Sequence, residues 1–279
     1  MSCYRGFRLG PDRLHRAKEV PIGMAVALVI PFDEKLQLTP SQLPSGPVDA
    51  NASTSPIGGP KTSRTGEEDN GCWSEVEVTF APWAALTIFG TTLQQLANVA
   101  IEPRALLGPR ADDLTEALAT AVGWKERFAL LDVVLTEWAR SGPASSTRVA
   151  WAWQELAHRA GAVPIPVLAR RVGWSQRQLE KRFREQIGLT PKAIARVFRL
   201  QRALQLLDSG LPSAEVATLA GYHDQAHFGH DCKAMTGHAP GRFIACRVAG
   251  SPGPWSADRG EGQAPGVPMP ASIRTATSV

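Results

Sequence analysis

Cysteines and long apolar runs are both scarce in this sequence of 279 residues. The four cysteines have neither the close pairing of a disulfide framework nor the spacing of a zinc site: Cys3, Cys72, Cys232 and Cys246. We therefore expect free thiols in a reducing, cytoplasmic environment. The longest apolar run, residues 22–31, is far too short to cross a bilayer, so no membrane association is expected. Asp12 and Glu19 interrupt the basic N-terminal region, which argues against a secretory signal.

Recognisable catalytic motifs are also missing. Residues 1–145 contain no glycine-rich phosphate loop and no motif that pairs a nucleophile with a base. His15 is the single histidine of that region and has no evident acidic partner. Cys3 and Cys72 are too isolated to form part of a reactive four-cysteine cluster. We therefore predict that the protein is not an enzyme and carries no cofactor.

The sequence does contain a tandem repeat, between residues 165 and 247. The first pair of landmarks recurs at an offset of 48, Ala169 and Gly173 matching Ala217 and Gly221. The second pair recurs at an offset of 49, Gly188 and Pro191 matching Gly237 and Pro240. A repeat of this kind indicates that one supersecondary unit is used twice, with one residue inserted in the second copy.

Each copy predicts a helix-turn-helix. A short helix runs into a glycine, which can adopt positive φ without steric cost, and a polar N-cap, Ser175 or Asp224, begins a second helix. In the first copy Leu179, Phe183 and Ile187 recur every four residues and are expected to face the core. In the second copy the inner face is predicted to hold Phe228, Cys232 and Met235.

The outer faces of these two second helices are the candidate binding surfaces. In the first copy this surface holds cations, amides and one carboxylate: Gln176, Arg177, Glu180, Lys181, Arg182 and Arg184. In the second copy it holds Gln225, Ala226, Gly229, His230 and Lys233. Cations and amides on an exposed helix are suited to phosphates and to base edges in a major groove.

The charge of the chain is concentrated around the repeat. Residues 155–247 hold 14 Lys or Arg and 7 Asp or Glu, a net charge of +7, whereas the other residues hold 16 and 19, a net charge of −3. Such a basic region is typical of a nucleic-acid binder. An ordinary helical bundle with solvated charges is the alternative, and two copies in register favour DNA binding over it.

Two stretches carry a resemblance to a known family. "GWSQRQLEKRFREQIGLTPKAIARVFRLQRAL" and "VATLAGYHDQAHFGHDCKAMTGHAPGRFI" together resemble the C-terminal domain of AraC/XylS-type transcription regulators. The resemblance implies two helix-turn-helix units on either side of a linking helix, with both recognition helices in adjacent major-groove turns of double-stranded DNA. RNA polymerase and an unidentified small-molecule effector are further candidate partners. The implied base-reading positions are Arg177, Glu180, Lys181, Gln225, Gly229 and His230.

The second unit departs from the family pattern. Arg is common where this chain has His230, and Phe is common where it has Cys232. Gly229 within the helix costs roughly 1 kcal/mol relative to Ala. We therefore expect the first unit to carry most of the base readout, while Lys233 and the helix N-terminus of the second unit hold phosphate. The alternative function is a degenerate or non-specific DNA-binding protein whose second helix-turn-helix does not read bases.

A metal site is an alternative role for the histidines of this unit. His223, His227 and His230 stand at positions i, i+4 and i+7, with Cys232 nearby. The second ligand pair of a closed structural site is missing, so histidines that face DNA or pack partly into the protein are favoured and no metal is expected.

The fold class expected is mainly α, with a small α+β N-terminal domain and a C-terminal all-α tandem helix-turn-helix domain. The N-terminal regulatory or interaction domain is placed at 1–144, the DNA-binding domain at 145–247 and a disordered tail at 248–279, with 39–71 a disordered loop. The helix 191–208 spans about 27 Å, a length suited to holding two recognition helices about one DNA turn, roughly 34 Å, apart. Its basic side carries Lys192, Arg196, Arg199 and Arg202.

The N-terminal domain is expected to combine a few strands with helices. Strands are predicted at 24–30 and 74–80, and helices at 81–90, 112–121, 125–139 and 145–161, with 93–100 continuing the helical run after Gly90. "FAPWAALTIFG", "LLGPRADDL", "WKERFALLD" and "VAWAWQEL" loosely resemble the N-terminal domain of a subgroup of AraC-like regulators. In that subgroup a further strand-forming segment usually occupies the place of 39–71. A sensory role and a docking or dimerisation role both remain open for this domain.

Overall fold

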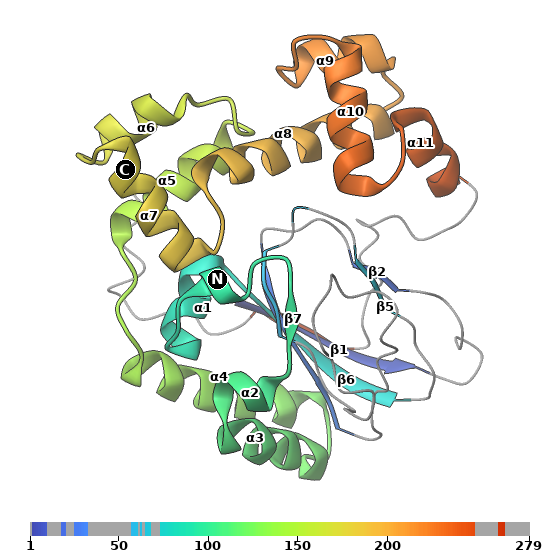
Figure 1. The fold of residues 1–279 in the computed structure, drawn as a ribbon. Coiled ribbons are helices and arrows are strands. Elements are labelled where there is room, and N and C mark those ends of the chain that lie inside the picture. The colour runs from blue at the N-terminus through green and yellow to red at the C-terminus, as the bar shows by residue number, and fades with distance from the viewer. Residues whose placement is uncertain are drawn as a thin grey trace.

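The fold combines a β-sheet with helices on one side and a helical array beyond it (Figure 1). The computed structural model describes residues 2–9, 18–20, 25–32, 57–60, 62, 65–67, 73–248 and 262–265. His15 and Cys72 lie outside these residues, as do most of 39–71 and most of the predicted tail. The expected fold class, mainly α with a small α+β N-terminal part, is confirmed. No helix in the described part of the chain has the length and apolar character needed to cross a membrane.

The larger sheet has six strands in the order β7-β4-β3-β6-β1-β8, and every neighbouring pair is antiparallel. Its strands are β1 (Ser2–Leu9), β3 (Val26–Pro31), β4 (Ile57–Gly58), β6 (Trp73–Phe80), β7 (Ala100–Ile101) and β8 (Gly262–Pro265). A separate two-stranded sheet pairs β2 (Lys18–Val20) with β5 (Thr65–Glu67).

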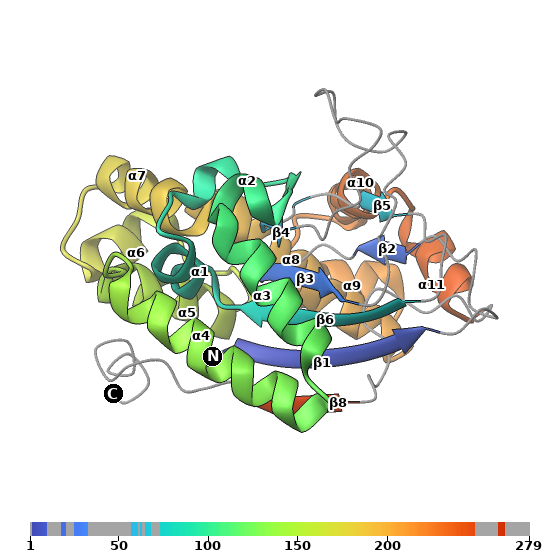
Figure 2. The same ribbon diagram turned by 90° about the horizontal axis from the view of Figure 1, so that it is seen from below.

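Strand β6 pairs with β1 and β3 in the middle of the larger sheet, and its alternating pattern gives it an apolar face. Val76, Val78 and Phe80 are almost completely buried. Helices α3 (Pro109–Thr120) and α4 (Trp124–Ser141) cover one face of the sheet (Figure 2). Side chains of α4, among them Phe128, pack with Tyr4 of β1 at 5.9 Å between ring centroids. The strands predicted at 24–30 and 74–80 and the helices predicted at 112–121 and 125–139 are therefore confirmed, with ends shifted by a few residues.

Three N-terminal and tail predictions need correction. Residues 57–60 lie within the segment 39–71 predicted to be disordered, yet β4 pairs with β3 and buries Ile57 completely. Part of the predicted disordered tail, residues 262–265, pairs with β1 as the edge strand β8. The helical run predicted at 93–100 is instead the 3-10 turn η3 (Leu93–Gln95) followed by β7, and Asn98 between them has φ of +61°. The composition of residues 57–60 and 262–265 predicted no ordered structure. The first segment is held by the buried Ile57 and by pairing with β3, and the second by pairing with β1.

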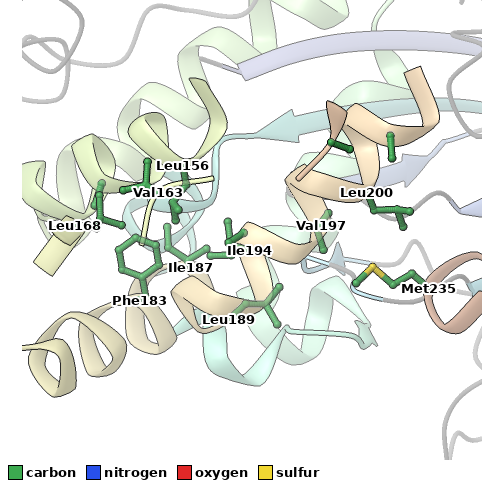
Figure 3. Packing of buried hydrophobic residues seen from close by; sticks show 14 of the residues in the cluster. Leu156, Val163, Leu168, Phe183, Ile187, Leu189, Ile194, Val197, Leu200 and Met235 are labelled. Carbon is green, nitrogen blue, oxygen red and sulfur yellow. The ribbon is translucent and has the colours of Figure 1, made fainter. Parts of the chain in front are cut away.

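The C-terminal part consists of seven helices within the described residues. They are α5 (Thr147–His158), α6 (Ile165–Arg171), α7 (Gln176–Ile187), α8 (Pro191–Asp208), α9 (Ser213–Leu219), α10 (Gln225–Thr236) and α11 (Pro240–Val248). Figure 3 shows how side chains from α5, α6, α7 and α8, such as Leu156, Phe183 and Ile194, meet in one apolar cluster. The long helix α8 runs between α7 at one end and α10 at the other (Figure 1).

Helix α1 (Pro82–Phe89) connects the two parts of the fold, and all eight of its residues are buried. Trp83 and Ala84 belong to the apolar cluster of the C-terminal helices, whereas the helix from Ala85 onward contributes to the cluster beneath the sheet. The Trp83 ring packs edge-on against Trp153 of α5 at 4.9 Å, and Trp153 packs against Phe198 of α8 at 5.2 Å. The N-terminal part therefore contacts the linking helix α8 through a chain of aromatic rings.

Candidate nucleic-acid interface

The first helix-turn-helix unit is formed by α6 and α7. Gly173 in the turn has φ of +70°, the conformation that glycine was predicted to supply. The Ser175 hydroxyl accepts a hydrogen bond from the Gln178 backbone N–H at 3.2 Å and so caps α7. Leu179, Phe183 and Ile187 are completely buried. Their burial turns the opposite face of α7 outward, as the periodicity predicted.

The outward face of α7 is the predicted polar surface. Gln176, Arg177, Lys181, Arg182 and Arg184 are exposed, and Glu180 is half-buried. The Gln176 amide donates to the Glu180 carboxylate at 3.3 Å, and Glu185 pairs with Arg182 at 3.2 Å and with Lys181 at 3.9 Å.

The two remaining arginines of this face differ from their neighbours. Within the part of the chain that the structure describes, Arg177 and Arg184 make no ion pair. These two guanidinium groups can therefore bind an incoming acceptor without first losing a partner.

The second unit, α9 and α10, repeats this construction. Gly221 has φ of +77°, and the Asp224 carboxylate accepts the His227 backbone N–H at 2.7 Å. That hydrogen bond, followed by one with the His223 ring at 3.0 Å, holds the pKa of Asp224 below its ordinary value. Phe228 and Cys232 are fully buried and Met235 nearly so.

The outward face of α10 is plainer than that of α7. Gln225, Ala226, His230 and Lys233 are exposed, and Gly229 is half-buried. A Cβ atom placed on Gly229 would meet nothing within 4 Å, so no close packing demands glycine there. Lys233 is the one Lys or Arg among these five residues, whereas the face of α7 carries four: Arg177, Lys181, Arg182 and Arg184.

The alternative of a metal site finds no support in the geometry of α10. His223, His227 and His230 are exposed, whereas Cys232 lies on the buried side of the helix with its sulfur 3.7 Å from the Thr236 hydroxyl. Burial also raises the pKa of the Cys232 thiol, which disfavours the thiolate that metals bind. Among the described residues, no three His, Cys, Asp or Glu side chains gather as a metal site would require.

The structure adds a residue that sequence reasoning missed. Asp231 of α10 has a side chain only 5% exposed, and its Oδ1 lies 2.7 Å from Nη2 of Arg196 on α8. Next to this pair, the Arg199 guanidinium lies 5.6 Å from the ring centre of Tyr222. The contact joins residues 35 apart on two helices, so no local period could indicate it. It fixes α10 to the linking helix α8.

A groove of about 830 Å³ lies between the two units. Its lining comes from the loop between α5 and α6, the first residues of α6 and α7, one side of α8 and the side of α10 that lies next to α8. The polar residues among them are Gln176, Lys192, Arg196, Arg199, His227, His230 and Asp231. Because residues of both predicted recognition helices border one groove, both helices lie on the same side of α8.

Comparison with known proteins identifies the C-terminal segment. Residues 168–245 match the family model described as a helix-turn-helix domain. The chain is 33% identical over 70 residues to the uncharacterized HTH-type transcriptional regulator YbfI of Bacillus subtilis, and 37% identical over 70 residues to the HTH-type transcriptional regulator MtrA of Neisseria gonorrhoeae. Each match covers 25% of this chain, 26% of YbfI and 23% of MtrA, so the chain spans about a quarter of the length of these relatives.

Solved structures of ToxT from Vibrio cholerae align with most of the chain at low similarity. One of them covers 88% of this chain and 98% of its own at 9% identity, with a TM-score of 0.44.

Proposed function

We propose that residues 168–245 form a double helix-turn-helix domain of the AraC/XylS type and that the protein is a sequence-specific DNA-binding transcription regulator. The DNA-binding domain is assigned to 145–247 and the regulatory or interaction domain to 1–144. Transcription regulation implies RNA polymerase as a further partner in the cell. The alternative is a degenerate or non-specific DNA-binding protein whose second helix-turn-helix does not read bases.

One observation carries the proposal. The capped helices α7 and α10 lie near the two ends of α8, present polar faces outward and border a single groove. A helix of 18 residues spans about 27 Å, which approaches the roughly 34 Å between successive major-groove segments on one face of DNA. The pair Arg196–Asp231 holds the second of these helices against α8. One chain can therefore present two recognition helices to one side of a duplex.

The roles within the first unit follow from hydrogen-bonding chemistry. Arg177 and Lys181 would donate to O6 and N7 of guanine, and Glu180 would accept from N4 of cytosine after exchanging its bond with Gln176. Arg182 and Arg184 would hold phosphate together with Gln176 and the capped helix start at Ser175.

The second unit would rely more on the backbone of the duplex. Lys233 and the helix start at Asp224 would hold phosphate, while Gln225 and His230 would reach base edges. Gly229 offers no side chain and would only permit close approach. This division makes α7 the main reader.

We propose that the N-terminal domain acts on the two helix-turn-helix units through α1. Its Trp83 lies in the same apolar cluster as the helices of the first unit, and the aromatic chain reaches Phe198 of α8. A ligand or partner that moved α1 would therefore act on the linking helix. Both an effector and a second protein chain fit this arrangement.

Selection from random duplexes tests the function. The full chain is incubated with a pool of random duplexes at two salt concentrations, and the retained DNA is sequenced. Enrichment of two short motifs about one helical turn apart is expected. One enriched motif would reduce the second unit to a phosphate contact. No enrichment, with binding that collapses as salt rises, would reject specific recognition.

A further inference from the structure

The linking helix α8 carries a basic stripe that lies between the two helix-turn-helix units. Lys192, Arg196 and Arg199 stand at i, i+4 and i+7, so they share one face of the helix. All three line the groove between the units. The opposite side of α8 is apolar, and Ile194, Val197 and Leu200 are buried in the core shown in Figure 3. The basic stripe is therefore held in a fixed direction by the packing of α8.

The walls of the groove are the recognition helices themselves. Gln176, the first residue of α7, borders it on one side, and His227 and His230 of α10 border it on the other. On the proposed function, a duplex that engages both α7 and α10 would lie across the groove that these helices border. The part of the duplex that lies there is the backbone between the two major-groove segments.

The charges of the groove favour an anion. Three cations line it against one carboxylate, Asp231, whose side chain is nearly buried and is paired with Arg196. Arg199 is half-buried against the ring of Tyr222. Lys192 is exposed, and among the described residues it makes no ion pair. Lys192 is therefore the cation freest to take an incoming phosphate.

The remaining lining suits the sugar that accompanies each phosphate. The loop between α5 and α6 contributes small and apolar residues, among them Ala162, Val163 and Pro164. A deoxyribose ring presents an apolar face of comparable size. A groove with cations on its floor and apolar residues of this loop along its edge matches a sugar-phosphate chain better than it matches a bare ion.

We propose that this groove, with Lys192 and Arg199 on its floor, binds the sugar-phosphate backbone of DNA between the two major-groove segments. The inference rests on the proposed function and adds to it a third contact region, on the linking helix, that reads no bases. Arg196 acts as a positioning residue, because it holds Asp231 and thereby α10. The groove contributes affinity that depends on salt and not on sequence.

The test compares Lys192→Gln with Arg202→Gln in the full chain. Arg202 is exposed on the same helix but does not line the groove, so both variants remove one charge from α8. Affinity for a mixed-sequence duplex of about four helical turns is measured across a range of salt concentrations. Each lost phosphate contact lowers the slope of log Kobs against log salt by about 0.9, which is about 3.5-fold in affinity over a fourfold rise in salt.

The expected result is a slope lowered by about 0.9 in Lys192→Gln and unchanged in Arg202→Gln, with Lys192→Arg restoring the original value. Equal slopes for Lys192→Gln and Arg202→Gln, in a chain that binds the duplex, would overturn the groove contact and leave the proposed function standing. A parent chain that shows no binding would overturn both.

Discussion

Gly188 and Gly237 form a matched pair for measuring the contact between the N-terminal part and the first helix-turn-helix unit. They occupy the same place in the two repeats, ending α7 and α10 in the left-handed conformation with φ of +91° and +77°. A Cβ at Gly188 would lie 2.6 Å from the Leu93 carbonyl oxygen of the N-terminal part, whereas one at Gly237 would meet nothing within 4 Å. Only the first glycine therefore reports on the contact between the two parts.

The two Ala variants should differ in stability by the cost of that clash. Left-handed backbone costs an Ala residue roughly 1–2 kcal/mol, and this cost applies to both variants. Overpacking adds typically about 1–3 kcal/mol, and it applies only to Gly188→Ala because the nearest atom is backbone and cannot rotate away. We expect Gly237→Ala to lower the free energy of unfolding by about 1–2 kcal/mol and Gly188→Ala by about 2–5 kcal/mol.

Urea unfolding of the full-length variants, followed by tryptophan fluorescence, measures the difference. Trp83 and Trp153 lie at the contact and report on its loss. Equal losses for the two variants would show that η3 does not press on the end of α7, and the contact between the N-terminal part and the first unit would then rest on α1 alone.

Three further results are expected. Arg177→Ala should relax specificity at about one base pair and cost roughly 1–3 kcal/mol of binding free energy, whereas Arg184→Ala should lower affinity evenly and flatten the salt dependence; the opposite pattern in sequenced selections would exchange their roles. The pKa of Asp224 is lowered in the fold, so the charged carboxylate stabilises the folded protein above the unfolded pKa of about 3.9, and this stabilisation is lost as pH falls through the folded pKa. The difference in Tm between the parent and Asp224→Asn should therefore shrink in acid. The buried Cys232 thiol, with its raised pKa, should resist alkylation until the protein unfolds, and rapid native labelling found by mass mapping would contradict its burial.

The repeat allowed the C-terminal helices to be predicted from sequence. The glycines of the two turns, the N-caps Ser175 and Asp224, and the apolar spacing of α7 each act locally, within one or two helical turns. Such signals depend on neighbouring residues alone. Helix α8 was predicted with the correct bounds because Thr190 caps it, its side chain accepting the Ala193 N–H at 3.2 Å.

What sequence missed depends on contacts between distant residues. Asp231 looks like an ordinary polar residue of α10 until α8 places Arg196 beside it. Ile57 stands in a stretch rich in Pro, Ser and Gly, and only its pairing with β3 shows that it belongs to the core. The groove likewise arises because the loop after α5 and the helix α10 meet on one side of α8. No periodic pattern along the chain predicts these contacts.

The proposal that one chain binds two DNA motifs through α7 and α10 is tested most directly by inserting base pairs between the two selected motifs. Adding about half a helical turn, roughly 5 bp, moves the second motif to the opposite side of the duplex. Because α8 is one continuous helix and Arg196–Asp231 fixes α10 to it, the chain should then engage only one motif, and its affinity should fall to that of a duplex with the other motif scrambled. Unchanged affinity after the insertion would contradict the account, because two heads on a fixed helix cannot follow the motif around the duplex.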